Sequence, residues 1–261
     1  MKKYILALVL IISAITSEEI SAQGPPITTD KPIMLGGSTM ILRTLMESRS
    51  NTQGHFTSIP IIYHYLPSSN SLVGVHIPMV GFSFDGEPER SGFGIGDISV
   101  LAKYQFYRSD GTGRTFRIVG KTFQTLPTGK ALEFGTHSSG EYQSYFGVVA
   151  GYESLKYGIS NEIGYNWAPS DVEDEVRYKL GFGLPLLKPT YPVNQLNLYF
   201  EYQSSWFPEA NEYMMLYAQG LQYAKGRYTF EAAVQVPLIQ NRAFIRERNY
   251  SLLFGTRVIL N

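Results

Sequence analysis

The stretch Lys156–Trp167, KYGISNEIGYNW, alternates between two kinds of side chain. Successive side chains of a β-strand point to opposite faces, so this pattern predicts a strand with one apolar and one polar face. The apolar face holds Tyr157, Ile159, Ile163, Tyr165 and Trp167, and the opposite face holds Gly158, Ser160, Glu162, Gly164 and Asn166. A soluble protein would turn the apolar face onto a second sheet, whereas an outer-membrane barrel would turn it onto lipid.

Two-sided segments of this kind recur along the chain and predict about twelve strands. Most are about 9–13 residues long, which exceeds the usual ~5–6 of soluble sheets and suits tilted strands that cross a bilayer. The predicted strands are Thr39–Glu47, Phe56–Leu66, Ser71–Val80, Gly96–Tyr107, Arg114–Leu126, Glu141–Glu153, Lys156–Trp167, Glu175–Leu184, Gln195–Trp206, Glu212–Tyr223, Arg227–Val236 and Asn249–Leu260.

The connections between these strands alternate in length. Long ones include residues 81–94 and 126–140, and short ones include PSSN, SL and AKG. Transmembrane barrels have short turns on the periplasmic side and longer loops outside, so the pattern places both termini in the periplasm. Two connections depart from this pattern. Residues 185–194 are long where a turn is expected, and residues 207–211 are short where a loop is expected.

The polar faces carry charge at mid-strand, far from any turn. Tyr and Trp favour the strand ends on the apolar faces, as interfacial girdles do, and glycines favour the polar faces, where a narrow lumen needs small residues. We therefore expect an all-β fold, a single closed antiparallel transmembrane barrel, with charges that pair inside it. The candidate lumen and solute-path residues are Asp97, Lys103, Arg117, Lys121, Glu162, Arg177, Lys179, Glu201, Glu231 and Arg257, together with Glu153.

The N-terminus has the anatomy of a secretory signal peptide. Lys2 and Lys3 precede an apolar run of about 12 residues, which is too short to span a bilayer, and Ser21 and Ala22 suggest cleavage after residue 22. This predicts Sec export to the outer membrane of a Gram-negative bacterium. No later segment has 18 consecutive apolar residues, which excludes a helical membrane protein.

Three parts are expected: a signal peptide over residues 1–22, a proline-rich segment over 23–37, and a barrel over 38–261. The stretch GPPITTDKP cannot join a sheet, since proline lacks the N–H that the ladder needs. Its apolar residues suit burial as a lumen plug, and the alternative is a disordered periplasmic tail.

Composition excludes several classes of function. The chain has 22 basic and 22 acidic residues and no long basic stretch, which argues against a nucleic-acid partner. It has no cysteine, so a disulfide scaffold and a thiolate metal site are excluded.

Three short motifs superficially suggest catalysis or cofactor binding. GFGIGD (92–97) is followed by a strand where a dinucleotide loop needs a helix, and LPTGK lacks the remaining P-loop residues. THSS (136–139) has no recognisable acidic partner for a serine nucleophile. We therefore expect neither an enzyme nor a cofactor.

His64 and His76 fall on the polar faces of two strands joined by PSSN. Neutral imidazoles that become cross-strand neighbours can share a transition metal. No third ligand is visible, so ordinary polar lumen residues are the simpler interpretation.

A succession of motifs spans the chain from about Gly24 to Leu260: GPPITTDKPIML, GFGIGDISVLAKYQF, KTFQTLPTGK, FEAAVQVPL and LLFGTRV. Their order resembles the outer-membrane family named for the meta-pathway of phenol degradation. The resemblance implies a barrel in the style of FadL-type channels that pass hydrophobic or aromatic compounds. The C-terminus VILN departs from the aromatic residue with which many barrels end.

The sequence thus predicts a passive channel for small apolar or aromatic solutes. Its expected partners are outer-membrane lipid, those solutes, and the barrel-assembly machinery during insertion. Two alternatives remain open: a non-transporting surface or structural barrel that interacts through its long loops, and a soluble periplasmic β-barrel binder.

Overall fold

A computed structural model describes residues 26–32, 34, 36–85, 90–129, 139–169, 173–187, 193–242 and 247–260. Three predicted features lie wholly or partly outside these ranges. They are the signal peptide (1–22), residues 23–25 of the proline-rich segment, and residues 136–138 of the motif THSS. Within them, no helix has the length and apolar character needed to cross a membrane.

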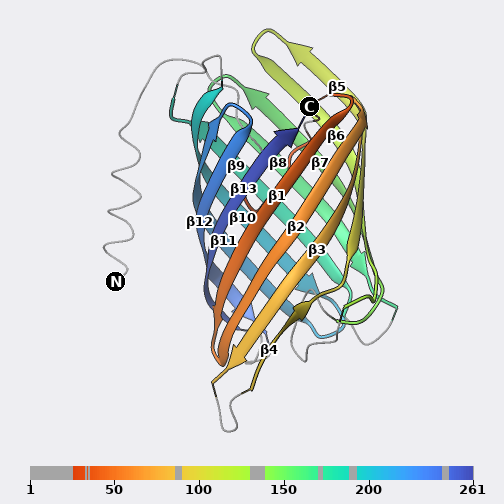
Figure 1. Cartoon of the computed structure of the whole chain (residues 1–261), viewed down its shortest axis with the longest axis vertical. Coiled ribbons are helices and arrows are strands. Elements are labelled where there is room, and N and C mark those ends of the chain that lie inside the picture. The colour runs from red at the N-terminus through yellow and green to blue at the C-terminus, as the bar shows by residue number, and fades with distance from the viewer. Residues whose placement is uncertain are drawn as a thin grey trace.

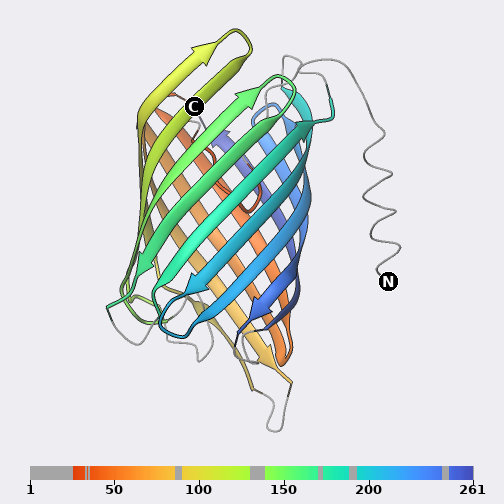
Figure 2. The ribbon, with the colours of Figure 1, turned by 180° about the vertical axis from the view of Figure 1, so that it is seen from behind.

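Twelve long strands pair in antiparallel fashion and close into a barrel (Figures 1 and 2). The wall runs from β1 through β2, β3 and β5 onward to β13, which pairs with β1 again. The strands are β1 (Thr39–Asn51), β2 (Gly54–Ser68), β3 (Ser71–Phe84), β5 (Ser99–Gly111), β6 (Arg114–Thr125), β7 (Gln143–Ser154), β8 (Gly158–Trp167), β9 (Glu175–Pro185), β10 (Asn194–Phe207), β11 (Glu212–Lys225), β12 (Tyr228–Asn241) and β13 (Arg248–Leu260). The predicted all-β barrel is confirmed.

A further strand, β4 (Arg90–Ile95), corrects the prediction that residues 81–94 form a loop. The lower part of β3 pairs with β4, from Met79 opposite Ile95 to Phe84 opposite Arg90, while the upper part of β3 pairs with β5. Glycines in GFSF and SGFGI suggested a loop, yet both stretches keep the period-two alternation that a hairpin needs. This hairpin extends the wall without joining its closure (Figure 1).

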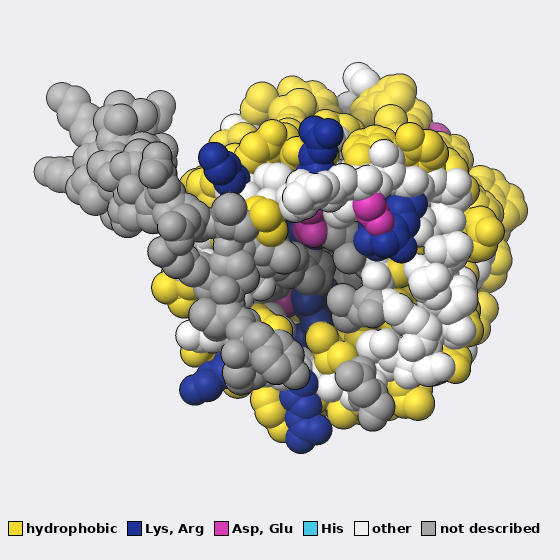
Figure 3. Space-filling model, turned by 90° about the horizontal axis from the view of Figure 1, so that it is seen from above, with side chains coloured by type: hydrophobic (Ala, Val, Ile, Leu, Met, Phe, Trp, Pro, Cys, Tyr) yellow, Lys and Arg dark blue, Asp and Glu magenta, His cyan; other side chains and the backbone are white. Residues whose placement is uncertain are grey.

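Apolar side chains cover the outside of the barrel, as the alternation predicts. In β8 the exposed fraction of Ile163 is 60%, whereas that of its neighbour Glu162 is 1%. Seen from above, hydrophobic side chains surround the rim (Figure 3). Other exposed apolar residues of the wall are Phe146, Val148, Leu221, Phe230, Val234 and Phe254.

The two ends of the barrel differ in their connections. The C-terminus and the turns that join β2 to β3 and β7 to β8 lie at one end, which we call the terminal end (upper end in Figure 1). The connections that lead from β4 to β5 and from β6 to β7 lie at the opposite end, which we call the loop end. Exposed Trp167 and Trp206 lie near the loop end, in the last residues of β8 and β10, and exposed Tyr157 and Tyr228 lie at the terminal end.

Candidate functional site

The described residues between 26 and 36 run through the interior of the barrel, and we call them the lumen segment. Ile27 and Lys31 keep only 2% and 6% of their surface exposed, and Met34 keeps 7%. Pro26 and Pro32 are also buried. The segment adopts no regular structure before the chain turns into β1, as its prolines require.

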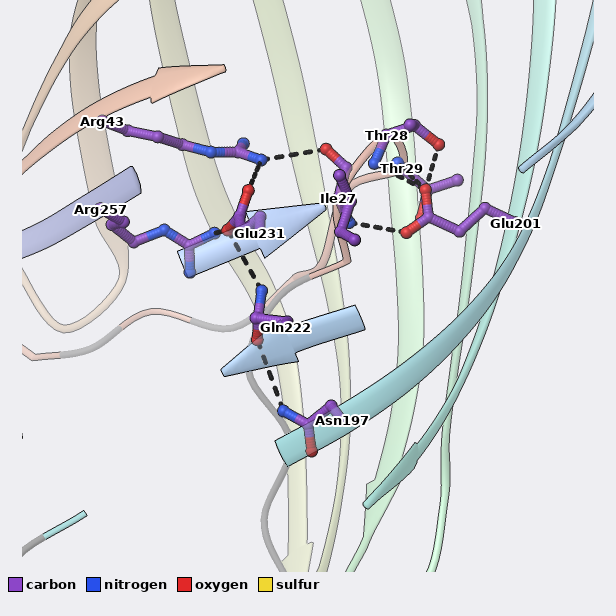
Figure 4. A network of polar contacts seen from close by, with 9 residues as sticks. All are labelled: Ile27, Thr28, Thr29, Arg43, Asn197, Glu201, Gln222, Glu231 and Arg257. Atoms are coloured by element: carbon purple, nitrogen blue, oxygen red, sulfur yellow. Dashed lines mark hydrogen bonds and ion pairs between the residues drawn. The ribbon is translucent and has the colours of Figure 1, made fainter. Parts of the chain in front are cut away.

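Glu201 of β10 holds the beginning of the lumen segment (Figure 4). Its Oε1 accepts the backbone N–H of Ile27 at 2.6 Å, and its Oε2 accepts those of Thr28 at 2.6 Å and Thr29 at 3.0 Å. The hydroxyl of Thr28 donates to the same carboxylate. Hydrogen bonds to an ionised acceptor are about twice as strong as neutral ones, so one buried carboxylate fixes three successive residues.

Two charged side chains of the lumen segment pair with the wall. Asp30 lies between Lys103 of β5, at 2.5 Å, and Lys121 of β6, at 2.9 Å. Lys31 forms an ion pair with Glu153 of β7. Because all of these groups are shielded from water, each charge needs the opposite charge that the segment brings.

A polar network on the wall supports the other side of the segment (Figure 4). Arg43 of β1 donates to the carbonyl of Ile27 at 3.0 Å and to Glu231 at 2.6 Å. Glu231 also pairs with Arg257 and accepts a bond from Gln222 at 3.1 Å. The network therefore couples the segment to β1, β11, β12 and β13.

Glycines of the wall make room for the lumen segment. A Cβ added at Gly151 would lie 2.6 Å from Cδ of Pro32, and one added at Gly181 would lie 2.5 Å from Oγ1 of Thr29. Both distances are shorter than van der Waals contact, so these positions require glycine while the segment is docked.

The lumen also contains an apolar patch, which the expectation of a polar interior missed. Met34 packs in a buried cluster contributed by β1, β2, β3, β5 and β6, with Phe123 against it. We call this cluster the apolar lumen patch, and its wall members are Ile41, Leu66, Leu72, Leu101 and Val119. On the opposite wall, Ile27 packs with Tyr199, Ala233 and Leu253.

The other predicted lumen residues lie inside the barrel but belong to separate groups. Lys121 pairs with Glu162 at 2.9 Å, and Lys179 donates to the carbonyl of Thr28 at 3.3 Å. Arg177 pairs with Glu175 of the same strand, and Arg117 lies 4.0 Å from Asp110. Charges thus pair along the wall, and those that face the lumen segment pair with it.

The prediction that Asp97 lies on a strand is wrong. It lies in the connection between β4 and β5 at the loop end, where it is 1% exposed. Its carboxylate accepts the backbone N–H groups of Gly129 and Gly140, each at 2.9 Å, and contacts the hydroxyl of Ser139 at 3.4 Å. Asp97 therefore ties two connections together, because a carboxylate in a turn finds backbone donors more readily than a strand partner.

The two histidines meet inside the barrel, with Nε2 of His64 3.0 Å from Nε2 of His76. They are diagonal neighbours, since His64 is opposite Gly74 and His76 is opposite Ile62. No cluster of three or more His, Cys, Asp or Glu able to hold a metal ion occurs within the described ranges. The pair makes a hydrogen bond, and a metal role for it stays a prediction.

A charged cluster at the loop end was not predicted from the sequence. Glu47 accepts bonds from Arg49 at 3.1 Å, Arg248 at 3.5 Å and Ser251 at 2.9 Å. Alternation within β1 places Arg43, Glu47 and Arg49 on one face and was the available signal. The partnership of Asp30 with two lysines had no sequence signal, because it depends on how far the segment reaches into the barrel.

Comparisons with known proteins support the fold. No family model and no curated protein matches the sequence. A solved structure of the COG4313 outer membrane channel from Pseudomonas putida F1 superimposes with a TM-score of 0.65 at 13% identity, covering 91% of this chain and 100% of that one. KdgM porin superimposes with a TM-score of 0.52 at 8% identity, covering 85% of this chain and 99% of its own. NanC porin gives the same TM-score at 12% identity, covering 83% of this chain and 98% of its own. The chain therefore shares the architecture of outer-membrane barrels, while its membership of the phenol meta-pathway family stays a prediction.

Proposed function

We propose that this protein is an outer-membrane channel that lets small solutes diffuse through its lumen, and that the lumen segment closes it. The observation that carries the proposal is the docking of the lumen segment inside the barrel through Glu201, Asp30 and Lys31. The similarity to an outer membrane channel and to two porins supports the same class of function.

The contacts that hold the lumen segment favour a plug that can move out of the barrel. Side chains of the wall hold the lumen segment, which forms no strand ladder with any part of the barrel. Its departure would break ion pairs and hydrogen bonds while the closed wall of twelve strands stays intact. Water that enters the lumen would solvate the released charges and offset part of their loss.

The apolar lumen patch supports small apolar or aromatic solutes as cargo. Met34 covers this patch in the closed lumen, so the departure of the segment would expose an apolar surface along β1 to β6. The chain would reach the outer membrane by Sec export, with residues 1–22 removed, and the barrel-assembly machinery would insert it.

A non-transporting surface barrel is the competing function. Asp97 binds Gly129 and Gly140, which lie near the two ends of the connection between β6 and β7, and so gives such a barrel a tied point at the loop end. Under that reading, the lumen segment would be a permanent structural core.

Liposome swelling separates the two functions. The chain from residue 23 onward and a variant without residues 24–37 are reconstituted into liposomes, and their folding is checked by heat-modifiable migration. We expect slow permeation of small solutes through the first and fast permeation through the second. If neither protein passes any small solute, the channel proposal is wrong.

A further inference from the structure

Lys103 and Lys121 form a pair of like charges directly across two strands. They are opposite each other in the register of β5 and β6, and their side chains keep 9% and 13% of their surface exposed. Like charges directly opposite in a sheet destabilise it, more so where little water screens them. The pair therefore needs an anion between the two ammonium groups, and Asp30 now supplies it.

The site for this anion has one further neighbouring carboxylate. Glu162 accepts a bond from Lys121 at 2.9 Å, and Tyr145 donates to the same Oε1 atom at 2.7 Å. Glu162 thus neutralises part of the charge of Lys121, while Lys103 forms its hydrogen-bonded ion pair with Asp30. A single carboxylate fits this demand, whereas a cation would be repelled and a neutral solute would leave the lysines unbalanced.

Apolar side chains flank the lysine pair on the same face of the sheet. Leu101 and Phe123 form the next inward cross-strand pair on one side, and Val119 lies opposite Gln105 on the other. Leu101 and Val119 belong to the apolar lumen patch, which Met34 covers, and Phe123 packs against it. The lumen segment thus presents a carboxylate to two lysines and an apolar side chain to the adjoining surface.

We infer that the lumen segment mimics the solute, and that the wall of β5 and β6 recognises small monocarboxylates with an apolar or aromatic body. The carboxylate takes the place of Asp30 between Lys103 and Lys121, and the apolar body takes the place of Met34 on the patch. The solute and the segment then compete for one site. This inference rests on the proposed channel and names its solute class.

The test compares two probes of the same shape, benzoate and benzamide, in the liposome assay. Through the chain from residue 23 onward, benzoate should permeate about tenfold faster than benzamide, the equivalent of one charge-assisted hydrogen bond. The double variant Lys103→Gln with Lys121→Gln should lose this preference, so that the ratio of the two rates approaches one. The quantity to compare is the ratio of the benzoate rate to the benzamide rate, because the double variant also weakens the binding of Asp30 and so raises both rates.

Two controls keep the test specific. Lys225→Gln removes an exposed lysine from the end of β11 and should leave the ratio unchanged. The double variant Lys103→Arg with Lys121→Arg keeps both positive charges and should retain the preference for benzoate. Heat-modifiable migration shows which variants fold. If the double Gln variant does not fold, the single variant Lys103→Gln, which keeps the ion pair of Lys121 with Glu162, carries the test and should lose the preference.

The outcomes distinguish this inference from the channel itself. Failure of both probes to permeate the chain without residues 24–37 would contradict the proposed function. Equal rates for benzoate and benzamide through a conducting chain would overturn the inference alone, as would a benzoate preference that survives Lys103→Gln with Lys121→Gln.

Discussion

At the scale of single residues, Glu201 does most to hold the lumen closed. It accepts three backbone N–H groups and one hydroxyl from consecutive residues of the lumen segment. An irregular, proline-containing segment cannot satisfy its N–H groups through a sheet, so they depend on this carboxylate.

Replacing this carboxylate should open the channel. Glu201→Ala leaves N–H groups of Ile27, Thr28 and Thr29 without their acceptor, at a cost of about 1–3 kcal/mol for each group that stays buried. We expect the open fraction in single-channel recordings to rise by at least about tenfold. Glu209→Ala, which removes an exposed carboxylate from the turn between β10 and β11, is the matched control and should change nothing.

Asp30 gives the closed state a defined dependence on pH. Burial alone would raise the pKa of the Asp30 carboxyl, but Lys103 and Lys121 hold that pKa well below its ordinary value. A carboxyl whose pKa is lower in the docked state stabilises docking above its ordinary pKa of about 4 and loses this contribution as pH falls through the lowered value.

The contribution of Asp30 to the closed state should therefore survive mild acid. We expect the ratio of the conductance of Asp30→Asn to that of the natural chain to stay constant from about pH 8 down to about pH 5 and to fall only in stronger acid. Asp30→Asn should conduct more than the natural chain throughout that range. Opening of the natural chain near neutral pH would show that another group controls the docking.

At the scale of elements, the packing of the lumen segment against β7 and β9 depends on missing side chains. Gly151 of β7 lies against the ring of Pro32, and a proline ring cannot rotate away as a long side chain can. The wall and the segment are therefore matched in shape as well as in charge.

A single methyl group should test this match. Gly151→Ala would place a Cβ 2.6 Å from Cδ of Pro32, so either the segment or the strand must shift. We expect higher conductance with the barrel still heat-modifiable, because β7 keeps its backbone pairing. Gly94→Ala, where an added Cβ meets no atom within 4 Å, should behave like the natural chain.

The strands also show how much of the fold and of the site could be predicted from the sequence alone. Alternation in Lys156–Trp167 correctly predicted which residues of β8 face outward, because a period of two is a local property. It missed β4, whose glycines resemble a loop, and it placed Asp97 on a strand. The contact of Asp30 with Lys103 and that of Glu201 with Ile27 each join residues more than 70 positions apart, and no local pattern predicts such contacts.

At the scale of the whole molecule, the barrel has an apolar outside and an inside with many polar and charged side chains. Val234 is 49% exposed on β12, while Gln235 beside it is 4% exposed. Each of the twelve strands of the closed wall pairs with a neighbour on both sides, and β4 lies outside this closure. Pairing on both sides is the condition for placing a sheet in hydrocarbon.

The cost of a charge on this outer surface should depend on its depth. Val234→Arg, near the middle of β12, should lower the free energy of unfolding in lipid vesicles by about 2–4 kcal/mol. Tyr228→Arg, at the beginning of the same strand, should cost only about 0–1 kcal/mol. Similar costs at both positions would indicate that β12 does not cross a bilayer.

The most direct test of the whole account uses two positions on β8. The chain has no cysteine, so Ser160→Cys and Ile163→Cys each introduce a unique thiol. Ser160 is 1% exposed and lies beside Thr29 of the lumen segment, whereas Ile163 is 60% exposed on the outer surface. In liposomes, a water-soluble thiol reagent should leave both positions unmodified in the chain from residue 23 onward. Removal of residues 24–37 should make Ser160→Cys reactive and leave Ile163→Cys protected by lipid. Equal reactivity of Ser160→Cys with and without the segment, or ready modification of Ile163→Cys, would contradict the account.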